Sequence, residues 1–188
     1  MDENTIREIC SHSVLLSDYF CGIICWRNAE TSSILMHKIG SFIIINYENS
    51  HWFAIQKIGK NKILIFDSFG GKYIPSKNDL KNASINLFSP RPKWINAEFV
   101  VSKSNILQSI NSLLCGEHVI NFLLYSCKSM KKFNRIKSNY ASKLIQTSKK
   151  LHISCDMYVW NRIYNILHLA PKPNLAEVCE WYGMFHKF

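Results

Sequence analysis

Residues 41–67 read "SFIIINYENSHWFAIQKIGKNKILIFD", and this stretch indicates the centre of the fold. Its first part follows a glycine and is rich in β-branched side chains, which predicts a buried strand at 41–48. Two more strand-like runs follow at 51–58 and 62–69, and the segment "GKN" between them indicates a hairpin turn. We therefore expect a sheet core near the middle of the chain.

The segments that flank this core have other patterns. Residues 3–20 carry apolar side chains at helical spacing, with Asn4 or Thr5 as the expected N-cap. Residues 70–96 are rich in Pro, Asn, Ser and Lys, which predicts loops with one short strand at 85–88. A further strand is expected at 97–102, and helices at 115–127, 138–152, 155–170 and 174–185.

This order of elements predicts an α+β fold with a mixed central β-sheet flanked by helices. The 188 residues suit a single domain, and there is no internal repeat or low-complexity tract. We expect an N-terminal helical segment at 1–40, a sheet region at 41–110, and a helix with a helical tail at 111–188.

The composition is that of a globular protein, with 47% hydrophobic and 19% charged residues. No apolar run approaches the roughly 20 residues that span a bilayer, and the polar start is unlike a secretory signal. We therefore expect a soluble intracellular protein that neither enters membranes nor is secreted. The seven cysteines are odd in number and irregularly spaced, so a disulfide framework is not expected.

The first cysteines also raise the question of a metal site. Cys10, His12, Cys21 and Cys25 lack the spacing of a zinc knuckle and lie in apolar surroundings. Buried thiols are the better interpretation, and no metal site is expected.

His51 and Asp67 lie at the outer ends of the two expected hairpin strands, so their side chains can meet. A carboxylate in that place would hold the imidazole in one tautomer and stabilise its protonated form. A purely structural pair at the end of a sheet is the alternative.

Cys115 and Gly116 stand where a loop gives way to an amphipathic helix. The helix dipole and the free backbone N–H groups at such a position favour a thiolate. The glycine leaves room for a substrate backbone, and the amide of Gln108, seven residues upstream, would complete an oxyanion hole with the N–H of Cys115. A thiol buried in the core is the alternative.

His-Trp on one strand, Asp on the next, and Gln-x6-Cys-Gly at a helix start together resemble the adenovirus endopeptidase (adenain) family of cysteine proteases. The resemblance covers about residues 42–125, and it extends more distantly to the SUMO-deconjugating and ubiquitin-like proteases. It implies a papain-like, adenain-like fold with the nucleophile at a helix N-terminus.

The resemblance implies a thiol protease in which Cys115 is the nucleophile, His51 its base and Asp67 the acid that orients the base. Gln108 would donate to the oxyanion, while Trp52 and Gly116 would line a narrow substrate channel. The implied activity is virion maturation, with cleavage of virion precursor proteins at Gly-containing sites. The protein would then act as a monomer in the virion and in the nucleus or cytoplasm of the infected host cell.

Three features depart from the family or stay open. Asp67 stands where adenoviral enzymes often have Glu, and residues 68–107 contain no cysteine, so a disulfide-tethered activating peptide is not expected. A non-covalent activating peptide stays open. His118, one turn after Cys115, is either a second partner for the thiolate or a residue on the face of the helix.

The net charge of +10 favours an acidic partner. Basic residues are dense after the expected catalytic helix begins, and the family uses DNA as a cofactor, so we expect non-specific DNA binding, with a solvated helical face as the alternative. The expected DNA-binding residues are Lys128, Lys131, Lys132, Arg135 and Lys137.

Three functions therefore stand as hypotheses. The first is a viral cysteine endopeptidase. The second is an isopeptidase (a deubiquitinase or SUMO-type enzyme) that acts on the Gly-Gly tail of a modifier. The third is a non-catalytic basic nucleic-acid-binding protein in which His51, Asp67 and Cys115 are structural.

Overall fold

A computed structural model describes residues 1–31, 34–87, 98–101, 106–133 and 139–167 of the chain. The helices are α1 (Glu3–His12), α2 (Lys77–Leu87), α3 (Cys115–Phe133), α4 (Tyr140–Lys150) and α5 (Cys155–Leu167), together with a 3-10 helix, η1 (Trp26–Thr31). The strands are β1 (Phe20–Cys25), β2 (Phe42–Tyr47), β3 (His51–Gly59), β4 (Lys62–Phe66) and β5 (Glu98–Val101).

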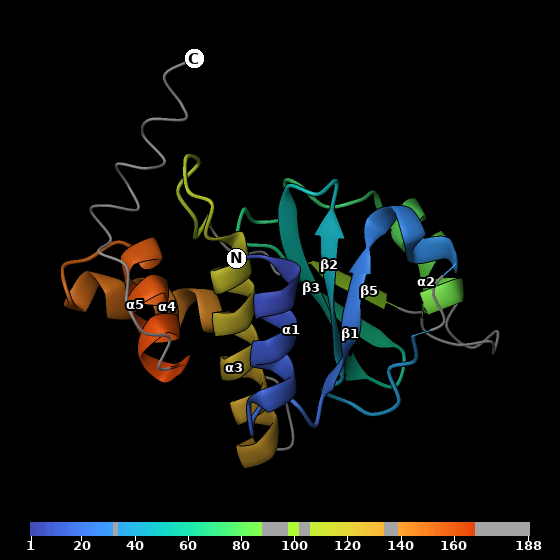
Figure 1. Ribbon diagram of the computed structural model, residues 1–188, viewed down its shortest axis with the longest axis horizontal. Coiled ribbons are helices and arrows are strands. Elements are labelled where there is room, and N and C mark those ends of the chain that lie inside the picture. The colour runs from blue at the N-terminus through green and yellow to red at the C-terminus, as the bar shows by residue number, and fades with distance from the viewer. Residues whose placement is uncertain (32–33, 88–97, 102–105, 134–138, 168–188) are drawn as a thin grey trace.

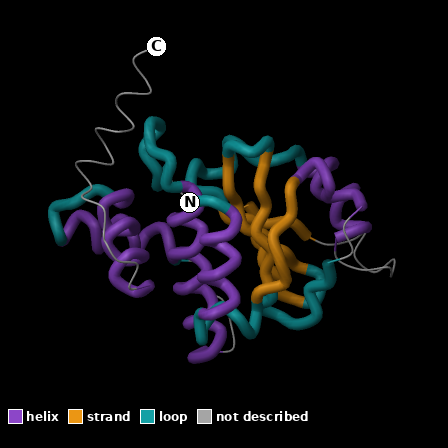
Figure 2. Tube along the Cα trace, in the orientation of Figure 1, coloured by secondary structure: helices purple, strands orange, loops and turns teal. Residues whose placement is uncertain are grey.

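The five strands form one mixed sheet in the order β1-β2-β3-β4-β5. The two inner pairings, β2 with β3 and β3 with β4, are antiparallel, and the two outer pairings are parallel. Helices flank this sheet on both sides (Figures 1 and 2). The predicted α+β class with a mixed central sheet is confirmed.

Alternate side chains of β2 and β3 enter two separate cores, as the period of two along a strand requires. Phe42, Ile44 and Ala54 pack with α1 and α3, while Ile43 and Phe53 pack on the other face with η1 and α2. Because both faces of the sheet are covered, the run at 42–45 is apolar at every position and fully buried. Each such isoleucine contributes roughly 2 kcal/mol through burial.

The turn between β2 and β3 fixes the place of His51. Glu48 and Asn49 adopt the left-handed region, with φ of 54° and 58°, and Tyr47 pairs with His51 across the turn. His51 is therefore the first residue of the central strand. The turn predicted at 59–61 is confirmed, since Gly59 pairs with Lys62.

Two details differ from the sequence-based expectation. The N-cap of α1 is Asp2, whose carboxylate accepts a hydrogen bond from the backbone N–H of Thr5 at 2.8 Å, so the expected cap at Asn4 or Thr5 is wrong. Within residues 1–40, expected to be helical, the short apolar segment at 20–25 forms β1 between α1 and η1.

Residues 70–76 form a loop, as expected, but the expectation of loops and a short strand at 85–88 is wrong over 77–87, which α2 occupies. Ser76 and Asp79 form a reciprocal cap at its start: the Ser76 hydroxyl accepts from the Asp79 N–H, and the Asp79 carboxylate accepts from the Ser76 N–H, each at 3.2 Å. The capping pair favours a helix here, although the residues that follow have a composition typical of a loop.

The C-terminal helices α4 and α5 lie against α3 on the side that faces away from the sheet (Figure 1). The helices expected at 115–127 and 138–152 are confirmed, and that at 155–170 is confirmed as far as residue 167. The segment at 174–185 lies outside the described residues. Among the described helices, none has both the length and the apolar character needed to cross a bilayer.

Candidate active site

The His51 and Asp67 side chains meet as the hairpin geometry predicts. Nε2 of His51 lies 2.8 Å from Oδ1 of Asp67, and both side chains are buried. Asp67 directly follows the last residue of β4, so the two residues come from the adjacent ends of β3 and β4.

The carboxylate of Asp67 is held by the turn that follows it. The backbone N–H of Phe69 donates to Oδ1 at 3.0 Å, and that of Gly71 donates to Oδ2 at 2.8 Å. Gly71 can make this turn because it has a φ of +89°, and a Cβ there would lie 2.8 Å from the Val101 side chain. Burial by itself raises the pKa of Asp67, but the hydrogen bonds from His51 and the two N–H groups outweigh it and lower the pKa.

Cys115 is the first residue of α3, as predicted, and its side chain lies near enough to the His51 imidazole to raise the pKa of that ring. Because Nε2 of His51 faces Asp67, Nδ1 is the ring nitrogen left for the thiol. Burial alone would lower the pKa of His51, yet the hydrogen bonds and charges of Asp67 and Cys115 raise it to about 9. The imidazole is therefore protonated at neutral pH, between a carboxylate and a thiol.

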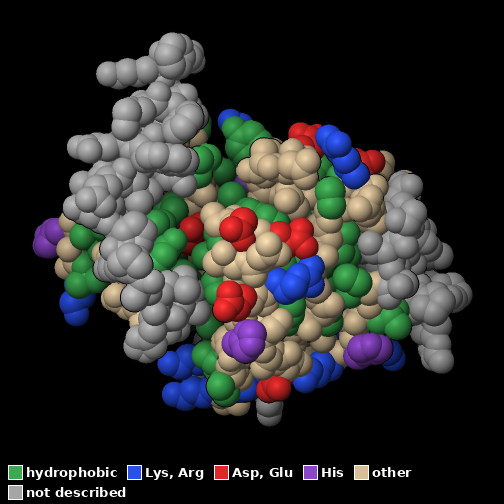
Figure 3. Space-filling model, in the orientation of Figure 1, with side chains coloured by type: hydrophobic (Ala, Val, Ile, Leu, Met, Phe, Trp, Pro, Cys, Tyr) green, Lys and Arg blue, Asp and Glu red, His purple; other side chains and the backbone are tan. Residues whose placement is uncertain are grey.

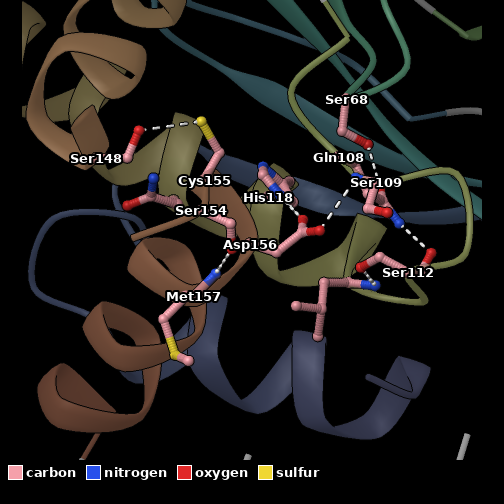
Figure 4. Close-up of polar contacts among 12 residues, drawn as sticks. Ser68, Gln108, Ser109, Ser112, His118, Ser148, Ser154, Cys155, Asp156 and Met157 are labelled. Carbon is pink, nitrogen blue, oxygen red and sulfur yellow. Dashed lines mark hydrogen bonds and ion pairs between the residues drawn. The ribbon is translucent and has the colours of Figure 1, made fainter. Parts of the chain in front are cut away.

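Gln108 connects the segments that carry Asp67 and Cys115. Its side chain is only 2% exposed; Oε1 accepts from the Ser68 hydroxyl at 2.6 Å, and Nε2 donates to the Ser112 carbonyl at 2.5 Å (Figure 4). The backbone N–H groups of Leu107 and Gln108 both donate to the Ser68 carbonyl. One hydrogen of the Gln108 amide therefore remains for a further acceptor.

Trp52 and Gly116, the expected walls of a substrate channel, both contact Met1. The indole Nε1 of Trp52 donates to the Met1 carbonyl at 3.2 Å. A Cβ on Gly116 would lie 3.1 Å from Cβ of Met1 and 3.5 Å from the Trp52 ring. The α-amino group of Met1 lies 3.7 Å from the buried carboxylate of Glu117. The space beside the start of α3 is therefore narrow.

Sequence reasoning missed the aromatic and apolar residues at the rim of the site. The rings of Phe69 and Tyr73 lie 5.5 and 6.0 Å from that of His51, centroid to centroid. On the loop before Cys115, Ile110 is 70% and Leu113 48% exposed. The apolar character of this loop was the signal in the sequence, because exposed apolar side chains beside a reactive group are suited to binding a ligand.

His118 lies on a face of the helix, the second of its two alternatives, and that face is buried against α5. It is completely buried, and its Nε2 lies 2.7 Å from Oδ1 of Asp156 on α5 (Figure 4). The other oxygen of Asp156 accepts from the backbone N–H of Ser109 at 3.0 Å. His118 is therefore part of a link between α3, α5 and the loop that carries Gln108.

The expected DNA-binding residues separate into three groups. Lys128 and Lys132 line a hollow between α3, α4 and α5. Lys131 points elsewhere, with Nζ 3.0 Å from the Asp18 carboxylate and 2.8 Å from the Val14 carbonyl. Arg135 and Lys137 lie outside the described residues.

No group of three or more His, Cys, Asp or Glu side chains in the described part of the chain is arranged to hold a metal ion. The candidate active site consists of a thiol, an imidazole, a carboxylate and an amide, which come from α3, β3, the end of β4 and the loop before α3.

No protein-family model and no curated protein sequence matches this chain.

Proposed function

We propose that the protein is an adenain-like cysteine endopeptidase in which Cys115, His51 and Asp67 form the catalytic triad. The observation that carries the proposal is the buried His51–Asp67 pair, whose imidazole also interacts electrostatically with Cys115 at the start of α3. A structural His–Asp pair needs no thiol, whereas a nucleophilic cysteine needs this base and its orienting acid.

Acyl transfer follows from this arrangement. The Cys115 thiolate attacks a peptide carbonyl, and the protonated His51 then gives its proton to the departing amine. His51, now neutral, takes a proton from water as that water attacks the thioester, which releases the acid and restores the thiolate beside the protonated His51. Because the pKa of His51 is raised to about 9, the activity should fall as the pH rises through that value.

The oxyanion would be stabilised by the backbone N–H of Cys115 and the remaining amide hydrogen of Gln108. The first N–H groups of a helix have no partner within the helix, so the start of α3 offers donors of this kind. The bonds of Gln108 to Ser68 and Ser112 support this role, because they fix the amide between the acid and the nucleophile.

For the substrate, we propose peptide bonds next to glycine, in virion precursor proteins of an infected cell. The close approach of Met1, Trp52 and Gly116 supports a channel that admits little bulk. The same chemistry would serve an isopeptidase on a Gly-Gly tail, so peptides with internal Gly-Gly or Gly-x sites should be compared with a ubiquitin or SUMO conjugate. Faster cleavage of the conjugate would favour the isopeptidase.

Alkylation by iodoacetamide at neutral pH, read cysteine by cysteine with mass spectrometry, tests the catalytic proposal. We expect Cys115 to react fastest and to become slow in a His51→Gln variant. Cys155 is a matched control, since it is also the first residue of a helix but its thiol contacts the Ser148 hydroxyl at 3.4 Å. Equal labelling of both cysteines, unchanged by His51→Gln, would contradict a thiol activated by histidine.

Cleavage of peptides then separates the enzyme from a basic binding protein without catalysis. Cys115→Ala should abolish hydrolysis, whereas Cys155→Ala should retain it, with both melting temperatures close to that of the unmodified chain. Retained hydrolysis in Cys115→Ala would exclude Cys115 as the nucleophile.

A further inference from the structure

A hollow of about 590 Å³ lies between α3, α4 and α5, apart from the candidate active site. Four of its lining residues are cationic: Lys128 and Lys132 on α3, Lys143 on α4 and Arg162 on α5. None of the described residues that line it is Asp or Glu. Three helices thus bring positive charge to one concave surface.

This concentration of charge is local. On the part of the face in Figure 3 that is not grey, basic and acidic side chains are interspersed. Lys131, the neighbour of Lys132, is bonded to Asp18 and does not line the hollow. Lys128 and Arg162 also line an adjacent, more apolar groove that contains Glu8, so they stand at the edge of the hollow. A concave surface lined by one sign of charge focuses the field on an anionic ligand.

Neutral polar groups complete the lining. Asn121 is completely buried; its Nδ2 donates to the Tyr140 hydroxyl at 2.7 Å, and its Oδ1 has no partner. If the amide is turned over, the NH2 group is left unpaired instead, so in either orientation one polar atom of Asn121 awaits a ligand or a water. The Tyr125 hydroxyl and Asn139 are bonded to each other at 2.5 Å on the same wall.

We propose that this hollow binds a small polyphosphorylated molecule, such as a phosphorylated sugar or polyol. Lysine and arginine from three helices match several phosphoryl groups, and Asn121 and the tyrosines match hydroxyl groups. The volume is that of a small-molecule site. The proposal does not depend on the catalytic role of Cys115. Phosphates of DNA carry the same charge, so the experiment separates the two sources.

Isothermal titration with sodium tripolyphosphate tests the site, with sulfate at equal ionic strength as the comparison anion. Lys128→Gln/Lys143→Gln removes two charges from the hollow. Lys149→Gln/Lys150→Gln removes two from the last turn of α4, outside the lining. We expect the first pair to weaken tripolyphosphate binding about tenfold or more and the second by no more than about twofold, because only contacts at the site are lost. Thermal melting verifies that both variants are folded.

Three results would overturn the proposal. One is the absence of tripolyphosphate binding to the unmodified chain at millimolar concentration. Another is an equal loss of tripolyphosphate affinity in the two double variants, which would indicate that the anion is attracted by the overall positive charge and not by a specific site. The third is duplex DNA that displaces tripolyphosphate, binds more tightly than it does, and loses affinity in Lys128→Gln/Lys143→Gln, which would assign these lysines to a nucleic-acid surface instead.

Discussion

Asp67 has no exposed surface, and its two carboxylate oxygens receive hydrogen bonds from His51, Phe69 and Gly71. Its hydrogen bond with the ring is the largest single reason that a buried imidazole stays protonated, since burial alone favours the neutral ring. The residue therefore controls the charge of the site although it is not expected to touch a substrate.

We expect Asp67→Asn to lower the pKa of His51 from about 9 to below its ordinary value of 6.5, because the desolvation of the ring would no longer be opposed by a carboxylate. Titration of the His51 ring by NMR measures this change. Asp156→Asn is the matched control, since that carboxylate is bonded to His118 and not to His51. A His51 pKa that stays near 9 in Asp67→Asn would show that Asp67 does not set it.

The same pair predicts how stability depends on pH. The pKa of His51 is higher in the folded state, at about 9, than the 6.5 of a free imidazole, so its contribution is complete below about pH 6.5 and is lost as the pH rises through 9. Asp67 behaves oppositely: its pKa is lowered, so its contribution is present above about pH 4 and is lost as the pH falls below that.

We therefore expect the loss of unfolding free energy in His51→Gln to be larger at about pH 6 than at about pH 10, by on the order of 3 kcal/mol. Urea unfolding at the two pH values measures it. His12→Gln on α1 is the control, because its exposed ring contacts only the Glu8 carbonyl at 3.0 Å among the bonds described. A loss in His51→Gln that does not change with pH would contradict the raised pKa.

At the scale of elements, the loop before α3 is joined to α5 by one carboxylate. Asp156 bonds with His118 on α3 and with the backbone N–H of Ser109 in the loop (Figure 4). Gln108 directly precedes Ser109 in that loop. The other ring nitrogen of His118 is buried and has no partner, so Asp156 is what satisfies this imidazole.

We expect Asp156→Ala to lower the unfolding free energy by about 2–4 kcal/mol, since a fully buried histidine and a backbone N–H would lose their acceptor. Asp18→Ala is the matched control: Asp18 is 57% exposed in its pair with Lys131, so its loss should cost much less. Denaturant unfolding of the two variants gives both values. Similar losses in the two would show that the buried link carries no special stability.

The elements that the sequence predicted well are those with local signals. The β-branched run after Gly40, the strand-like runs at 51–58 and 62–69 and the turn at 59–61 indicate a hairpin, and that turn brings the ends of its strands, with His51 and Asp67, side by side before any tertiary contact is known. The helix at 77–87 was missed because its signal is a pair of capping residues, Ser76 and Asp79, and not an apolar period. The partner of His118 could not be predicted, because Asp156 lies 38 residues away and only the packing of α5 on α3 brings it close.

For the whole molecule, the sheet and α1 form one side of α3, and α4 and α5 form the other (Figure 1). The sequence predicted these helices and the strands β2 to β5 but not β1. It could not show on which side of α3 the last helices pack, because an apolar helix face does not specify its partner. That packing creates the hollow lined by Lys128, Lys143 and Arg162, and through Asp156 it also reaches the loop with Gln108. The two candidate sites therefore share α3 and α5.

A ligand in the hollow should therefore slow local unfolding of the loop before α3. If tripolyphosphate bridges α3, α4 and α5, it binds only when α5 is seated, so it stabilises the seated form by mass action. We expect slower backbone hydrogen exchange in residues 106–114, where the Ser109 N–H donates to Asp156, and in α5, with no change in the hairpin of β2 and β3. Mass-spectrometric exchange with and without tripolyphosphate measures this, and Lys128→Gln/Lys143→Gln should remove the effect. Tripolyphosphate that binds but protects only α4 would mean that the hollow is not connected to the loop, and Asp156 would then serve the stability of α5 alone.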